Sequence, residues 1–364
     1  MDSKGAPYPI GSEERPYRLV TSGMCEASNA GDTVRVEGGI YLEPFRFTQP
    51  AVLSLQRGGS NAVFGRRTDG PKETLSVLTY NTHLWGDWYN IGIGPPRVQE
   101  DLRATAVGHR LPQANADIIG LQEVWDDELY ALIAETPWYA WSIYTDDEWD
   151  IDAGMGIFSR NSHNDGLGFL AFENLGIPDN LSDKGAVTWI TTKGPYTWRI
   201  WVTHTDASLT CDDCRWLNLA QLGTWVKQHM DAEPGVEVIV MGDFNINGDD
   251  EIARDRLANM EGWRDLNDAF MHAPCFSDKM NAEDDRTLHT ARNAFLRECL
   301  GDNHLDRYDQ VFYSTGRAFN VLPVAAEVPA DLFRVWPPIE DDDCTTSELS
   351  DHFPVQVDFE VWDL

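Results

Sequence analysis

Basic residues are scarce in this chain of 364 residues, in which 28 Lys and Arg stand against 60 Asp and Glu. The formal net charge is therefore −32 at pH 7. Binding to nucleic acid or to an anionic membrane normally depends on Lys and Arg that neutralise phosphates, so this composition argues against indiscriminate affinity for either. The acidic residues are spread along the whole chain, which is typical of a strongly hydrated surface such as that of salt-adapted proteins.

Long apolar runs and an N-terminal targeting pattern are also missing. No stretch of the sequence approaches the roughly 18 consecutive apolar residues of a membrane-spanning helix. No basic start is followed by an apolar run, so we expect that a secretion signal is absent or has been removed. Hydrophobic residues nevertheless make up 42% of the chain and aromatics 11%, with 14 Trp. This composition is sufficient for a large core and excludes a disordered acidic protein.

Cysteine is infrequent, and the six residues are Cys25, Cys211, Cys214, Cys275, Cys299 and Cys344. The segment "CDDC" at 211–214 is the only C-x-x-C pair, so a zinc site built from two such pairs is disfavoured. We expect this pair to close a small disulfide loop. A disulfide in turn predicts an oxidising compartment, and therefore a secreted or periplasmic protein.

The chain divides into two parts of different pattern. Residues 1–70 contain short alternating strands punctuated by Gly and Pro, as in "GDTVRVEGGIYLEPFRFTQPAVLSL", and resemble one or two rungs of a β-solenoid. Because so few rungs cannot bury a face alone, we expect residues 1–70 to form an accessory β-rich attachment to the rest. From Leu75 onward, buried strands alternate loosely with helices. Residues 71–364 are therefore predicted to form one α/β (α+β) domain of two packed mixed β-sheets flanked by helices.

Two segments of this domain show clear helical spacing of their apolar residues. They are "VQEDLRATAVGHRLPQANA" at 98–116 and "RWLNLAQLGTWVKQHM" at 215–230. The second helix is expected to turn one apolar stripe toward the core. That stripe comprises Leu217, Leu219 or Ala220, Leu222 and Val226.

Polar side chains stand at the ends of six predicted strands. They are Asn81, Glu123, His204, Asp243 with Asn245, Asp309, and Asp351 with His352. Any one of them could be a turn residue, but six such ends are expected to meet at one rim of the fold. Carboxylate and amide oxygens suit Mg²⁺, and imidazoles beside them can move protons near neutral pH. The combination predicts metal-assisted attack of water on a phosphate ester.

Seven motifs follow one another in the order found in the endonuclease/exonuclease/phosphatase superfamily. They are "LTYNTH", "DIIGLQEVW", "GMGIFSR", "VTHTD", "GDFNIN", "YDQVFYS" and "LSDHFPV". The chain resembles this superfamily over about residues 75–362. The resemblance implies that residues 71–364 are a catalytic domain, folded as a four-layer α/β sandwich with the active site at one rim of the two sheets.

The resemblance also implies a metal site. Glu123 in "LQEV" matches the metal-binding glutamate, with Asn81 and Asp351 beside it. Mg²⁺ is the implied cofactor, and Mn²⁺ or Co²⁺ could replace it.

Catalytic roles follow from the same matches. Asp243 and Asn245 in "GDFN" correspond to the pair that contacts the nucleophile and the phosphate. His352 corresponds to the general base, and Asp309 to the acid that orients it. His204 corresponds to the second histidine, which stabilises the phosphoryl oxygens or protonates the leaving group.

The segment "PDNLSDKGAVTW" at 178–189 resembles the "DNLSxKG" segment of neutral sphingomyelinases. This likeness implies that Asn180 and Lys184 bind the substrate. Those enzymes carry an aromatic residue after the "LQEV" glutamate, and Trp125 stands there in this chain. Its ring could hold a choline ammonium by cation–π attraction, and a packing role is the alternative.

A second lipid-related likeness lies in "ADLFRVWPPI" at 330–339, where secreted sphingomyelinases carry a membrane-touching hairpin. Its apolar tip would comprise Leu332, Phe333, Val335 and Trp336, although an ordinary buried turn is an equal alternative. The segment "THTDA" departs from the sphingomyelinase pattern, because Asp206 stands where an amide is usual.

Three functions are consistent with these features. The first is a secreted, Mg²⁺-dependent sphingomyelinase or phospholipase C, which releases phosphocholine from a phospholipid at a membrane surface. The second is a Mg²⁺-dependent nuclease of a salt-adapted organism, which the scarcity of Lys and Arg makes less favoured. The third is a catalytically inactive binding module, against which the intact set of strand-end residues argues. No obligate protein partner is implied.

Overall fold

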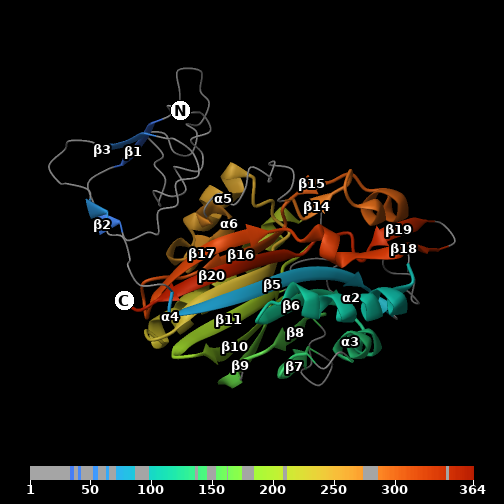
Figure 1. Cartoon of the computed structure of the whole chain (residues 1–364), viewed down its shortest axis with the longest axis horizontal. Helices are drawn as coiled ribbons and strands as arrows, with labels where there is room; N and C mark the ends of the chain where they lie inside the picture. Colours follow the sequence, from blue (N-terminus) through green and yellow to red (C-terminus); the bar gives the residue numbers. More distant parts are fainter. Residues whose placement is uncertain are drawn as a thin grey trace.

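Two six-stranded mixed β-sheets, packed face to face, form the body of the computed structural model (Figure 1). The structure describes residues 71–86, 98–135, 138–145, 153–161, 163–173, 184–207, 211–273, 286–341 and 344–364, together with four short strands between residues 33 and 64. Within these ranges, no helix has both the length and the apolar character needed to cross a membrane.

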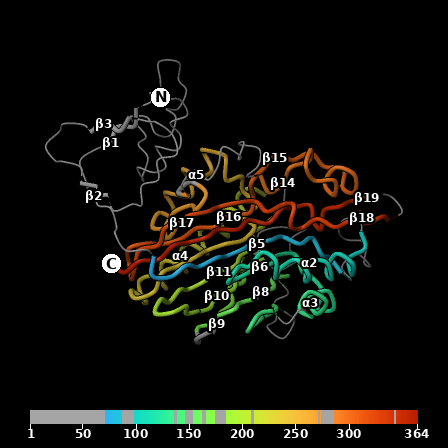
Figure 2. The backbone as a smooth tube through the Cα atoms, in the orientation of Figure 1, coloured from blue at the N-terminus to red at the C-terminus, as the bar shows by residue number. Residues whose placement is uncertain are grey.

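The first sheet has the strand order β17-β20-β5-β6-β8-β7. Its strands are β17 (Asn320–Glu327), β20 (Val355–Trp362), β5 (Glu73–Leu84), β6 (Ile118–Val124), β8 (Gly156–Ser159) and β7 (Trp141–Tyr144). β5 runs parallel to β6 and antiparallel to β20. Figure 2 shows β5 beside β20, which brings the start of the domain next to the end of the chain.

The second sheet has the strand order β13-β16-β12-β11-β10-β9. Its strands are β13 (Asn267–Asp268), β16 (Asp309–Tyr313), β12 (Glu237–Asp243), β11 (Tyr196–His204), β10 (Gly185–Lys193) and β9 (His163–Ala171). β11 and β12 are parallel, and the other neighbours are antiparallel.

Three apolar clusters hold the layers together. The central one fills the space between the sheets and includes Val77, Ile118, Trp189 and Met241. A second cluster packs the outer face of the first sheet against α2 (Glu100–Ala114) and α3 (Asp127–Ala134). The third packs the outer face of the second sheet against α4 (Asp212–Ala232) and α5 (Glu251–Ala258). This arrangement confirms the predicted four-layer sandwich.

The two predicted helical segments are confirmed as α2 and α4. On α4, Leu219, Leu222 and Val226 are buried as expected. The expectation was wrong for Leu217, which is only half-buried, and the alternative Ala220 is exposed. Trp216 is buried instead, because the larger indole lies on the face that packs against the second sheet.

Shorter elements complete the described chain. They are α6 (Ala269–His272), a π-helix (Phe295–Leu300), 3₁₀ turns (Trp263–Asp265 and Ala330–Phe333), and the strand pairs β14 (Leu288–His289) with β15 (Leu305–Asp306), β18 (Arg334–Glu340) with β19 (Thr345–Glu348), β1 (Thr33–Val36) with β3 (Val52–Leu55), and β2 (Ile40–Tyr41) with β4 (Val63–Phe64). The division into an accessory segment (1–70) and a catalytic domain (71–364) stays a prediction. A disulfide joins Cys211 to Cys214, as the sequence predicted, and another joins Cys299 to Cys344.

The structure of residues 330–339 decides between the two alternatives given for them, an apolar tip and a buried turn. Phe333 is 2% exposed, and its ring lies 4.8 Å from that of Tyr80, so it belongs to the core rather than to an apolar tip. Leu332 and Val335 are half-buried against the same cluster. Among the four residues of the expected tip, Trp336 alone is fully exposed, at 88%. The 3₁₀ turn just before β18 directs Phe333 inward, which the apolar pattern could not reveal.

A fully buried arginine on α2 ties this helix to two segments that reach the rim of the sheets. Arg103 donates to the backbone oxygens of Val98 (2.8 Å), Thr82 (3.1 Å), His83 (2.7 Å) and Leu349 (2.9 Å). Thr82 and His83 lie near the end of β5, and Leu349 precedes β20. A single guanidinium therefore fixes the spacing between two strand ends.

We expect Arg103→Met to lower the free energy of unfolding by about 3–5 kcal/mol, because it leaves several buried carbonyl oxygens without their donor. Arg110→Met is the matched control on the same helix. Arg110 donates to Arg334 O (3.0 Å) from a partly exposed position, so its loss should cost about 1 kcal/mol or less. Denaturant unfolding of both variants measures the difference, and equal losses would contradict the role of Arg103.

Candidate active site

Strands of both sheets end at one rim, and there they carry the polar residues predicted from the sequence. In the first sheet the central neighbours are β20, β5 and β6, and in the second they are β16, β12 and β11. The first sheet brings Asn81, Glu123, Asp351 and His352, and the second brings His204, Asp243, Asn245 and Asp309. The two groups meet where Asn81 Nδ2 donates to Asp243 Oδ2 at 3.0 Å.

A glycine lets β12 deliver its acid to the rim. Gly242 has a φ of +150°, and a Cβ on it would lie 1.9 Å from the carbonyl oxygen of Thr203 on β11. Any larger residue would separate the two parallel strands at this point. With glycine there, His204 is the register partner of Asp243. The glycine of the "MGD" segment therefore allows the core strand β12 to place the Asp243 carboxylate at the rim.

Three residues at the rim adopt left-handed backbone conformations. They are His83 (φ +51°), Glu123 (φ +55°) and Asn245 (φ +48°). Residues other than glycine rarely adopt such values, and each costs roughly 1–3 kcal/mol. Such strain is concentrated at functional sites, where the surrounding structure enforces it.

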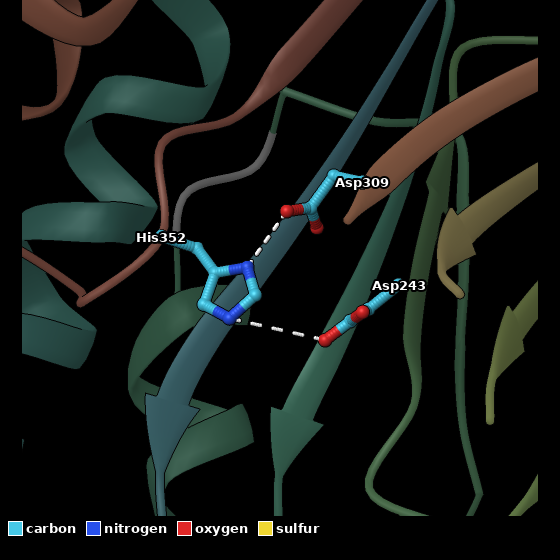
Figure 3. A group of neighbouring side chains, drawn as sticks. All are labelled: Asp243, Asp309 and His352. Carbon is cyan, nitrogen blue, oxygen red and sulfur yellow. Dashed lines mark hydrogen bonds and ion pairs between the residues drawn. The ribbon is translucent and has the colours of Figure 1, made fainter. Parts of the chain in front are cut away.

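His352 lies between two carboxylates (Figure 3). Its Nδ1 is 2.7 Å from Asp309 Oδ2, and its Nε2 is 3.8 Å from Asp243 Oδ2. Burial opposes the charge on the imidazole, but the carboxylates of Asp309 and Asp351 outweigh it and hold the pKa of His352 well above its ordinary value. Burial raises the pKa of Asp309 to about 6.

The donor atoms of Asp243, Asp309 and His352 all lie within 4.8 Å of one another. Such a group can hold a metal ion or serve as a base with its orienting acid. Here the short hydrogen bond to Asp309 occupies Nδ1 and leaves Nε2 facing Asp243. This geometry favours a base that Asp309 orients.

Glu123 and Asp351 face a residue that the sequence reasoning missed. His83 Nδ1 lies 3.2 Å from Asp351 Oδ2 and 3.5 Å from Glu123 Oε2. Burial alone would raise the pKa of Glu123, but the hydrogen bond with His83 and nearby positive charges lower it to about 2. The sequence did carry a signal for His83, which stands two residues after Asn81 in "YNTH", at the end of a predicted strand.

The pKa of His83, whose imidazole lies between Glu123 and Asp351, shifts upward. Burial alone would lower the pKa of His83, but Asp351 and Glu123 raise it to about 9. Burial likewise opposes ionisation of Asp351, yet the charge of His83 holds the pKa of this acid below its ordinary range. Without a metal ion, His83 therefore supplies the positive charge between the two carboxylates.

His204 stands on the other side of Glu123, next to a buried lysine. Its Nε2 lies 3.5 Å from Glu123 Oε1, and Lys184 Nζ lies 3.0 Å from the same nitrogen. Burial and the charge of Lys184 lower the pKa of His204 well below its ordinary value, so this imidazole is neutral. The Lys184 ammonium also lies 5.0 Å from the ring centroid of Trp125, which is buried.

Two predicted site residues remain, Asn245 and Asn180. Asn245 is half-buried: its backbone N–H donates to Asp243 Oδ1 (2.8 Å), and its side chain donates to Thr205 O (3.1 Å). Asn180 lies outside the described residues.

The acids at the rim fit a divalent cation. Within the described part of the chain, the buried Glu123 Oε2 has no hydrogen-bond donor closer than His83 Nδ1, which lies 3.5 Å away. Carboxylate oxygens without donors are costly to bury, and hard cations such as Mg²⁺ are their natural partners. Glu123 and Asp351, with Asn81 beside them, would hold such an ion.

Solved structures of low sequence identity share this fold. SmcL has a TM-score of 0.61 and 18% identity, with 79% of this chain and 99% of that chain covered. A Staphylococcus aureus beta toxin mutant with bound magnesium ions has a TM-score of 0.59 and 16% identity, with 78% and 99% covered. D. rerio TDP2 complexed with a single-strand DNA product has a TM-score of 0.56 and 17% identity, with 79% and 100% covered.

Sequence comparison identifies the family. No curated protein matches the chain. The model of the Endonuclease/Exonuclease/phosphatase family matches residues 88–352, which is well over half of the chain. Those residues hold the catalytic candidates from Glu123 to His352 at the rim of a four-layer sandwich. The chain therefore belongs to the endonuclease/exonuclease/phosphatase family.

Proposed function

We propose that this protein is a divalent-metal-dependent phosphodiesterase. The observation that carries the proposal is the buried His352 imidazole, held through Nδ1 by Asp309 and turned through Nε2 toward Asp243. An imidazole fixed in this way can take a proton from an attacking water once it is neutral, and a cation bound at Glu123 and Asp351 would lower its pKa toward that state. Asp243, 3.8 Å from Nε2, would orient that water, and Asn81 fixes the Asp243 carboxylate by its 3.0 Å hydrogen bond.

The other end of the site would receive the phosphate. Lys184 and His204 lie beside Glu123, where an ammonium and a neutral imidazole can donate to phosphoryl oxygens. Because His204 is neutral, we assign it to hydrogen-bond donation rather than to protonation of the leaving group. A divalent cation, when bound at Glu123 and Asp351, would polarise the phosphoryl group.

We further propose that the substrate is a phospholipid, and that the products are phosphocholine and a lipid alcohol. Attack of water on phosphorus, with one water proton passing to His352, would break the bond from phosphorus to the lipid oxygen, which takes a proton from solvent water. Lys184, the last charged residue of the "DNLSDKG" segment that resembles neutral sphingomyelinases, lies within the site. Trp336, 88% exposed on the β18–β19 hairpin, provides an apolar contact for a bilayer.

The proposed location of this enzyme is outside the cytoplasm. Cys211–Cys214 and Cys299–Cys344 are disulfides, and such bonds persist in oxidising compartments. Secretion, or export to the periplasm, would bring the enzyme to a lipid surface.

Nucleic acid is the second candidate substrate, because the similar TDP2 structure holds a single-strand DNA product. A nuclease normally grips several phosphates that flank the cut with Lys and Arg. With 28 basic residues against 60 acidic ones, this chain is poorly suited to that task. A lipid phosphodiesterase has one phosphate to neutralise, for which the metal, Lys184 and His204 are sufficient.

Hydrolysis of a phosphodiester should stop in chelator and return when Mg²⁺ or Mn²⁺ is added. Glu123→Gln should require a much higher metal concentration for half-maximal activity, because it removes a charged oxygen ligand. Glu298→Gln, an exposed change, is the matched control and should leave the metal requirement unchanged. Full turnover of the wild type in chelator would rule out metal dependence.

His352→Ala should lower kcat by about 10²–10⁴-fold with little change in KM, as expected for loss of a general base. Asp309→Asn should lose less, because it misorients the imidazole without removing it. Steady-state kinetics on a soluble choline phosphodiester measures both. Wild-type kcat in His352→Ala would refute the assignment of the base.

Trp336→Ala should lower activity on sphingomyelin vesicles about tenfold or more, since burying a large aromatic side chain contributes roughly 1.5–3 kcal/mol. Activity on a soluble choline phosphodiester should be unchanged. Trp138→Ala, a second exposed tryptophan, is the control and should affect neither assay.

Equal losses on vesicles and on the soluble substrate would count against membrane contact through Trp336.

Phosphocholine release and plasmid cleavage should be assayed side by side at low salt. Cutting of DNA without release of phosphocholine would establish the nuclease instead.

A further inference from the structure

A buried threonine just before β14 contacts the start of β16, from which Asp309 reaches His352. The side-chain oxygen of Thr287 accepts hydrogen bonds from the backbone N–H groups of Tyr308 (3.0 Å) and Asp309 (3.3 Å). The carboxylate of the same Asp309 places Oδ2 at 2.7 Å from His352 Nδ1 (Figure 3). Thr287 therefore lies next to the acid that orients the proposed base.

The hydroxyl of Thr287 has a proton to donate. A hydroxyl group offers one proton and two lone pairs, and here two backbone N–H groups use the lone pairs. Burial raises the pKa of Asp309 and is the largest effect on it, and a side-chain hydrogen bond with Thr287 is among the contacts that oppose this rise. The Asp309 carboxylate thus has two donors, the imidazole of His352 and the hydroxyl of Thr287.

The backbone of Thr287 supports the other member of the pair. Its carbonyl oxygen accepts from the N–H of Phe353 at 2.7 Å, next to His352 in the chain. Its own N–H donates to Asp306 O (3.0 Å), which fixes it on the hairpin of β14 and β15. Both members of the pair are therefore held from one residue, by its hydroxyl on the side of Asp309 and by its carbonyl oxygen on the side of His352.

We propose that Thr287 is a positioning residue of this proton-transfer pair, whose hydroxyl donates to the Asp309 carboxylate and holds it toward His352. Without this second donor, the carboxylate is free to rotate about its Cβ–Cγ bond, and the imidazole loses its fixed direction. In this role Thr287 acts through Asp309 rather than on the substrate. The inference rests on the proposed function, because it takes His352 as the base of phosphodiester hydrolysis.

The first test is steady-state kinetics of Thr287→Val and Thr287→Ser on a soluble choline phosphodiester with saturating Mg²⁺. Valine replaces the hydroxyl by a methyl group of similar size and keeps the backbone contact with Phe353. We expect Thr287→Val to lower kcat about 10- to 100-fold with KM unchanged, because a misplacement of about 1 Å can cost this much. Thr287→Ser retains the hydroxyl and should restore most of the wild-type kcat.

Thr290→Val is the matched control on the same hairpin. The side-chain oxygen of Thr290 accepts from the N–H of His304 (2.7 Å) and lies 3.2 Å from the carbonyl oxygen of Asp302, so valine removes hydrogen bonds of the same kind there. Denaturant unfolding should show losses of the same order for the two valine variants, whereas kcat of Thr290→Val should equal that of the wild type. A similar fall of kcat in both variants would overturn the proposal, since it would reflect general destabilisation.

A double variant separates action through Asp309 from an independent effect. If Thr287 works by holding the acid, Thr287→Val should add no more than about twofold to the loss of kcat caused by Asp309→Asn alone. Losses that multiply in the double variant, or wild-type kcat in Thr287→Val, would contradict the role of Thr287.

Neutron diffraction from crystals of the wild type tests the contact without any variant or turnover. The deuteron of the Thr287 hydroxyl should point to the Asp309 carboxylate, and a deuteron turned to another acceptor would refute the inference. If the wild type hydrolyses phosphodiesters but Thr287→Val retains its kcat, only the role of Thr287 is wrong. If the wild type hydrolyses no phosphodiester, both the inference and the proposed function are wrong.

Discussion

The balance of buried charge where the two sheets end is the constraint on which the rest of this structure depends. Four carboxylates and three imidazoles are buried there: Glu123, Asp243, Asp309 and Asp351, with His83, His204 and His352. A buried carboxylate is tolerated only when it is paired or coordinated, because desolvation of an isolated charge costs far more than a fold can supply. Each acid accordingly faces an imidazole or an amide, and a divalent cation would complete the compensation.

The scaffold enforces this close approach through backbone contacts. Gly242 lets β12 lie against β11, so that Asp243 and His204 come into register. Arg103 ties the end of β5 to the segment before β20, and Ser350 adds a 2.8 Å hydrogen bond to the carbonyl oxygen of Asn81. Catalysis by orientation requires reactive groups to be held within about 0.5 Å of their productive positions. Rigid backbone support of this kind serves that requirement. The strained backbone at Glu123 and Asn245 follows from the same demand.

Most of the fold and most of the site could be predicted from the sequence, because the motifs mark strand ends and strand ends meet at a common rim. Contacts that depend on three-dimensional packing were beyond reach. His83 was missed because only the structure shows that β5 lies between β20 and β6. The sequence left open whether Phe333 belongs to an exposed tip or to a buried turn, since an apolar residue in a turn carries no sign of the Tyr80 ring that it packs against. The sequence left open whether Trp125 binds choline or packs in the core; in the structure its ring is buried and lies 5.0 Å from the ammonium of Lys184.

The central claim is that a divalent cation completes the charge balance at Glu123 and Asp351, leaving His352 free to act as the base. Anomalous X-ray diffraction from crystals grown with Mn²⁺ tests it most directly. The account predicts one peak within about 2.0–2.4 Å of carboxylate oxygens of Glu123 and Asp351. A peak held instead by Asp243, Asp309 and His352 would contradict the account, because it would make the base a metal ligand.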